Sequence, residues 1–177
     1  MIAKNEKRFQ ELEARKERLL AEMSGYSEEV LNLPEKEGAW SVIECLHHLY
    51  ITEWGTGQYI RKKTQKPELI PPYSKVAALK LHMLRYTFAT GIKFKAPASL
   101  PKPSAGLTLE SLDKDWVKVR KSIHELMEEL PEDLQQKGIF RHPVAGRVNM
   151  HQTLDFFNFH FDRHERQIRR VLKAVTK

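Results

Sequence analysis

The sequence predicts an all-α protein, specifically a four-helix bundle with a long crossover between its second and third helices. Four segments of about twenty residues repeat apolar side chains at three- and four-residue steps, the period of a helix with one buried face. Two of these segments begin with a capping sequence, and no segment combines strand alternation with hairpin signals. Four amphipathic helices of this length most simply pack as a bundle.

The first two long helices are expected over residues 4–24 and 41–63. Ser41 and Glu44 form a capping box, in which each side chain satisfies a free backbone N–H group of the other residue. Residues 34–39 between the helices are typical of a short turn. We therefore expect these two helices to be antiparallel neighbours.

The third and fourth long helices are expected over residues 108–130 and 149–175, the last beginning at the capping pair Asn149 and Gln152. Roughly forty residues separate the second helix from the third. They contain a shorter predicted helix at residues 73–90 and an extended proline-rich stretch at residues 94–103. This length allows the third helix to run parallel to the second. Residues 1–177 are expected to form one domain.

Composition restricts the partners and the compartment. No apolar run is long enough to span a membrane, so no membrane partner is expected. The single cysteine, Cys45, and the absence of a secretory leader indicate the cytoplasm. The net charge of +7 raises the possibility of a nucleic-acid partner. The densest basic cluster, however, has the helical spacing of a solvated outer face, which argues against one; it comprises Arg163, Arg166, Arg169, Arg170 and Lys173.

Two of the eight histidines have a pattern that suggests a metal. His160 and His164 lie one turn apart on the apolar stripe of the fourth helix, so both imidazoles point into the bundle. Two adjacent buried neutral imidazoles need either a hydrogen-bond partner each or one metal ion that satisfies both. The pair alone favours neither alternative. It also lacks the glutamate of the His-Glu-x-x-His motif, and with it an in-motif general base.

A third ligand would have to come from the second helix. His47 and His48 are consecutive and about 100° apart around the helix axis, so only one of them faces the core well. The helical pattern does not choose between them. Gly55 and Gly57 indicate either space inside the bundle or a kink. The remaining histidines occupy polar or connecting segments and are interpreted as surface or loop residues: His82, His124, His142 and His151.

The sequence also suggests roles for the cysteine and for several aromatic residues. Cys45 is expected to be a core residue rather than a ligand. The tryptophans are expected to serve packing. Phe156 and Phe159 lie off the main apolar stripe of the fourth helix, so they are expected to meet either the crossover or a second subunit. The second alternative makes a homodimer plausible.

Two stretches resemble the signatures of one family. Residues 40–49, Trp-Ser-Val-Ile-Glu-Cys-Leu-His-His-Leu, resemble the Trp-Ser-x-x-Glu-x-Leu-x-His-Leu signature of the DinB/YfiT-like superfamily of metalloenzymes. His142-Pro-Val-Ala-Gly146, followed by His160-x-x-x-His164-x-x-Gln167-Ile168, is similar to its second signature, and residues 94–97 are similar to segments of some members. The resemblance covers residues 31–172. It implies a bundle with a three-histidine metal site and selects His48 rather than His47.

The resemblance also implies a class of function. Family members of known activity are transferases or isomerases that use low-molecular-weight thiols such as bacillithiol or mycothiol, and homodimers are common. We therefore expect a metal-dependent enzyme of the S-transferase type that acts on small electrophiles. A metal-dependent hydrolase and a non-catalytic metal-binding bundle are the alternatives. Three imidazoles suit zinc, nickel, copper or iron. No catalytic residue is assigned, and Glu44 and Gln167 are candidates to orient the ligands.

Overall fold

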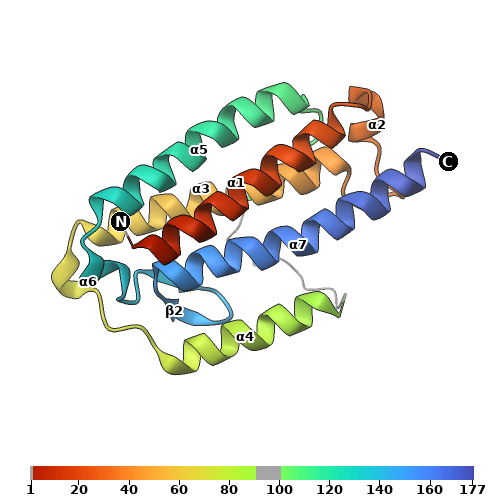
Figure 1. The fold of residues 1–177 in the computed structure, drawn as a ribbon. Coiled ribbons are helices and arrows are strands. Elements are labelled where there is room, and N and C mark those ends of the chain that lie inside the picture. The colour runs from red at the N-terminus through yellow and green to blue at the C-terminus, as the bar shows by residue number, and fades with distance from the viewer. Residues whose placement is uncertain (1, 91–100) are drawn as a thin grey trace.

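The computed structural model of the protein describes residues 2–90 and 101–177 and confirms the all-α prediction (Figure 1). Four long helices form the bundle, and their ends lie within one residue of the predicted ones. They are α1 (Ala3–Met23), α3 (Val42–Thr64), α5 (Leu109–Glu129) and α7 (Met150–Val175). Both predicted capping boxes are present, Ser41 with Glu44 before α3 and Asn149 with Gln152 before α7.

The order of the helices around the bundle differs from the prediction. Helices α1 and α3 run antiparallel, as expected, but each packs against both α5 and α7, so they stand on a diagonal and are not neighbours. The cause is α2 (Glu28–Asn32), which Ser27 caps and which packs against α3 and α7. This short helix lets the connection pass across the end of the bundle. Helices α3 and α5 run parallel, as the long crossover predicts (Figure 1).

The crossover adds a fifth long element to the bundle. It contains the short helix η1 (Pro67–Leu69) and then α4 (Lys75–Ala89), which lies within the predicted range 73–90 and packs along α7. In Figure 1, α4 follows α7 on the side away from α1 and α5. Most of the predicted extended stretch, residues 94–103, falls outside the described residues. All of residues 94–97, the segment similar to some family members, also fall outside the described residues.

The connection before α7 contains the elements that the sequence prediction missed. They are α6 (Glu132–Gln135) and a hairpin of β1 (Phe140–His142) and β2 (Gly146–Val148). Phe140 pairs with Val148 and His142 pairs with Gly146. The expectation that the chain has no strand is therefore wrong. Each strand is three residues long, too short for a readable alternation. Phe140 packs 5.7 Å from the ring of Tyr59, a distant residue in the sequence.

A buried ion pair joins three helices of the bundle. Two guanidinium nitrogens of Arg120 donate to the two carboxylate oxygens of Glu53, at 2.5 and 3.0 Å, and both side chains are at most 3% exposed. The indole N–H of Trp116 donates to the same carboxylate at 2.7 Å, and Arg120 also contacts Glu13 at 2.6 Å. Since Glu53 lies five residues after His48, this network fixes how α3 is rotated within the bundle.

We expect the substitution Arg120→Ala to lower the free energy of unfolding by about 3–5 kcal/mol, because it leaves the Glu53 carboxylate buried without a counter-charge. Urea denaturation followed by circular dichroism measures the change. Lys118→Ala is the control, since it removes an exposed ion pair with Asp115 and is expected to cost less than about 1 kcal/mol. Equal losses in the two variants would contradict the assigned role of the network.

Candidate metal centre

Helices α3 and α7 bring three histidines together inside the bundle. The Nε2 atom of His160 lies 3.3 Å from that of His48 and 3.1 Å from that of His164, and one ring nitrogen of each lies within 4.8 Å of the others. Two nitrogens bound to one tetrahedral zinc ion at about 2.0–2.1 Å stand roughly 3.3 Å apart. The spacing therefore suits a shared ion, and His48 is the histidine of α3 that meets the pair.

Local sequence places these rings. The capping box at Ser41 fixes the start of α3, so that His48 falls on the buried face of its second turn. His160 and His164 follow each other at a four-residue step on α7 and point the same way. The three side chains are between 5% and 7% exposed. His47 points elsewhere, and its Nδ1 atom accepts a hydrogen bond from the Ser104 N–H at 2.7 Å.

The hydrogen-bonding capacity of the cluster fits a cation at its centre. A neutral imidazole has one N–H donor and one acceptor nitrogen, so three facing Nε2 atoms cannot all be paired with one another. The Nδ1 atom of His164 lies 3.2 Å from Gln167 Oε1, which only accepts, so the His164 proton belongs on Nδ1. The lone pair on its Nε2 atom then points into the cluster. A metal ion would satisfy the lone pairs that otherwise face each other in a buried space, and the cluster therefore fits a metal-binding site.

Burial keeps the three rings neutral. Desolvation lowers the pKa of His48 to about 4 and that of His164 to about 3, and it moves the pKa of His160 well below its usual 6.5. Repulsion from the neighbouring rings and from the Arg163 cation lowers these pKa values further. At neutral pH all three imidazoles are thus in the form that coordinates a metal.

Aromatic rings surround the cluster. Trp40, directly before α3, has its ring centroid 4.9 Å from that of His48, and Phe156 stacks 5.1 Å from His160. Phe88 of α4 lies 6.0 Å from His160. The sequence interpretation assigned Trp40 to packing and did not single out Phe88. These rings also line the histidine cluster, which follows only from how the elements meet.

Arg163 is a site residue that the sequence interpretation placed on the solvated outer face. It is half-buried, and its guanidinium carbon lies 4.7 Å from the centroid of the Phe88 ring. The interpretation is wrong for this residue because α4 covers this side of α7, which the pattern of α7 alone cannot show. The result is a cation beside the cluster.

His142 was also misjudged, as a surface or loop residue. It is 5% exposed at the end of β1, with its ring 4.5 Å from that of Phe156. Its Nδ1 atom accepts the N–H groups of Val144 and Ala145, both at 3.1 Å, so its proton resides on Nε2. Burial lowers the pKa of His142 to about 4. Only the hairpin turns this ring inward, and the sequence carries no local signal of that.

The other candidates have structural partners. Glu44 accepts the Ser41 N–H at 2.9 Å in the capping box. Cys45 is fully buried, and burial raises the pKa of its thiol to about 12, as expected for an unreactive core residue.

Gly57 faces α5, where an added Cβ would lie 3.4 Å from Ile123. Phe159 packs 5.7 Å from Phe88, so it meets the crossover, the first of the two predicted alternatives.

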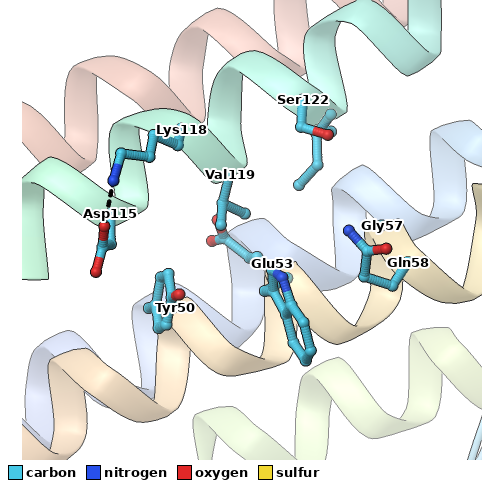
Figure 2. Close-up of a pocket in the computed structure, with 10 residues that line it drawn as sticks. Tyr50, Glu53, Gly57, Gln58, Asp115, Lys118, Val119 and Ser122 are labelled. Atoms are coloured by element: carbon cyan, nitrogen blue, oxygen red, sulfur yellow. Dashed lines mark hydrogen bonds and ion pairs between the residues drawn. The ribbon is translucent and has the colours of Figure 1, made fainter.

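A surface groove of about 220 Å³ between α3 and α5 lies apart from the cluster (Figure 2). Tyr50 and Gln58 line it from α3, and Lys118 and Ser122 line it from α5. The buried carboxylate of Glu53 reaches this groove, but none of the three clustered histidines does. The groove belongs to the α3–α5 interface that the buried ion pair holds together.

Comparison with known families agrees with this geometry. The sequence profile of the DinB superfamily matches residues 11–168, most of the chain. The chain belongs to the DinB superfamily. The matched range of this DinB protein includes all three clustered histidines and both capping boxes. No curated protein and no solved structure matches it. Among its described residues, no helix has both the length and the hydropathy needed to cross a bilayer.

We expect metal-free protein to lose stability as the pH falls from 6.5 towards 4. The unfolded chain binds protons on histidines with a pKa near 6.5, whereas the buried rings resist protonation down to pH 3 or 4. Each such ring contributes about 1.4 kcal/mol per pH unit within this window, and its contribution is complete above pH 6.5. Urea denaturation at several pH values measures the slope.

His142→Leu serves as the comparison for this slope. Removing one of the buried rings reduces the slope of the free energy of unfolding against pH by about 1.4 kcal/mol per pH unit, whatever the variant's absolute stability. A free energy of unfolding that is the same at pH 5 and pH 7 would show that the rings are not held neutral.

Proposed function

We propose that this DinB protein holds one divalent metal ion between His48, His160 and His164 and acts as a metal-dependent enzyme of the S-transferase type. The substrates would be a low-molecular-weight thiol and a small electrophile. The observation that carries the proposal is the convergence of three buried, neutral Nε2 atoms from two helices. Zinc, nickel and iron are among the metals that such a ligand set suits.

Gln167 is proposed to orient one ligand. Its Oε1 atom accepts the Nδ1 proton of His164 and so directs the Nε2 lone pair of that ring towards the other two histidines. Partners of this kind usually change metal affinity by about 10–100-fold. Glu44 already accepts a backbone N–H group in its capping box, so its proposed contribution is to hold the start of α3, and through it His48.

Three protein ligands leave a coordination position free, which is typical of catalytic rather than structural sites. A bound divalent ion lowers the pKa of a thiol or water that occupies such a position. The positive charge of Arg163 lowers the pKa of all three histidines. Within the described part of the chain, no carboxylate is among the charged groups that shift these pKa values. This balance favours an anionic thiolate. Hydrolysis would need a general base, and none is found there.

The apolar walls favour a small organic electrophile as the second substrate. Trp40, Phe88 and Phe156 surround the histidines and limit the access of water to them. Cys45 supports a reducing compartment such as the cytoplasm, because the single cysteine is a buried free thiol.

We expect protein loaded with zinc, nickel or iron to conjugate a low-molecular-weight thiol to a small electrophile such as a chlorodinitrobenzene, with a C–S bond formed, the C–Cl bond broken, and chloride and the thiol proton released. His160→Ala should lose both the bound metal and this activity, because only two of the three proposed ligands remain. Elemental analysis gives the metal content, and absorbance of the conjugate gives the rate. Gln167→Ala should keep the fold and bind the metal about 10–100-fold more weakly.

His82→Ala is the matched control, since it removes an exposed histidine of α4. It should keep full metal content and full activity. Equal metal content in His160→Ala and wild type would refute the site. Full metal content without conjugation of any thiol tested would refute the transferase and leave a non-catalytic metal-binding bundle.

We also propose that the protein forms a homodimer through α4. The side of this helix that faces away from α7 carries four large apolar residues, each between 61% and 65% exposed: Val76, Leu79, Met83 and Tyr86. Their three- and four-residue spacing is that of a helix–helix seam. A second copy of α4 packed on this stripe would remove it from water.

The double substitution Leu79→Asp with Met83→Asp should convert the dimer to a monomer, because it places two carboxylates in the apolar seam. Light scattering after size-exclusion chromatography measures the mass. Lys80→Asp, also exposed on α4, is the control and should remain dimeric. A wild-type protein that is monomeric at about 100 µM, which corresponds to an affinity too weak for a stable dimer, would contradict the proposal.

A further inference from the structure

A second groove, of about 250 Å³, lies where α3 ends and has a strongly positive lining. Lys62 and Lys63 line it from the last turn of α3, and Lys66 follows them. Arg147 of β2 contributes a fourth cation from the hairpin. No carboxylate belongs to the lining. Four positive charges therefore surround one small volume.

These cations lack neutralising partners within the described part of the chain, where none of the four forms an ion pair with a carboxylate. A further cation stands beside the groove without lining it, because Arg141 lies directly opposite Arg147 in the register of β1 and β2. Opposed like charges destabilise a strand pair. The helix dipole accounts for lysines at the end of α3, but it does not account for two opposed arginines on a hairpin. An anionic ligand would account for them.

The position of Arg147 is fixed by close backbone packing. The Gly138 N–H donates to the Pro71 carbonyl oxygen at 2.9 Å. A Cβ atom added at Gly138 would lie 3.0 Å from the Cβ atom of Arg147, so only glycine leaves room for this approach. The backbone of Arg147 is therefore held beside Gly138, which is itself bonded to the segment that follows α3, and this wall of the groove is formed before any ligand arrives.

We infer that this groove binds a small organic molecule that carries two or three linked phosphate groups. Several converging cations match a multivalent phosphate better than a single carboxylate, and arginine and lysine are the side chains that usually bind phosphate. Leu69, which is 70% exposed, supplies apolar surface for an organic part. Lys62 lies fourteen residues from His48 along α3, roughly 21 Å, so this site is separate from the metal centre.

Isothermal titration with tripolyphosphate and with adenosine triphosphate, both without added magnesium, tests the inference on the full-length chain. We expect saturable binding of one ligand per chain, with adenosine triphosphate at least as tight because its organic part meets the exposed Leu69. Arg147→Gln and the double variant Lys62→Gln with Lys66→Gln should each weaken binding, by about tenfold for every cation removed. Their circular dichroism and metal content should equal those of wild type.

The double variant Lys114→Gln with Lys121→Gln is the control, because it removes the same charge from exposed positions of α5 outside the groove. It should bind like wild type. Equal weakening in the control would show a response to net charge and overturn the inference, as would the absence of saturable binding. A short DNA duplex that displaces tripolyphosphate at lower concentration would overturn it in favour of a nucleic-acid surface.

Discussion

The contact between α3 and α7 is the constraint on which the rest of the structure depends, because three imidazole rings must meet where these helices pack. A rotation of either helix by one residue, about 100°, would turn its histidines out of the bundle. The fold resists such a rotation at several places. Capping boxes fix where both helices begin, and the buried pair of Glu53 and Arg120 ties α3 to α5 from its other side.

Burial gives the cluster its chemical character. Removal from water keeps the three rings neutral, and their converging Nε2 atoms suit a cation between them. The same neutrality lets a metal bind at pH 7 without first displacing protons from its ligands. The elements around the bundle complete the surroundings: α4 contributes Phe88 and covers Arg163, and the hairpin brings in His142. The core thus supplies the three histidines, and the connections supply the walls around them.

The sequence predicted what depends on local periodicity. Helix ends, both caps and the inward direction of His160 and His164 follow from spacing and from capping residues, and the structure confirms them. The choice of His48 over His47 needed the family resemblance. The diagonal placement of α1 and α3, the hairpin and the burial of Arg163 depend on contacts between distant segments. No pattern within a single helix encodes such contacts, and those expectations were accordingly wrong.

X-ray absorption spectroscopy of the zinc-loaded protein tests the central claim most directly, because it reports the atoms bound to the ion. The account predicts about three nitrogen neighbours at roughly 2.0–2.1 Å, with the outer-shell scattering of three imidazole rings. A shell made of oxygen alone would contradict it. So would a sulfur neighbour at about 2.3 Å, which would place the ion at Cys45 instead.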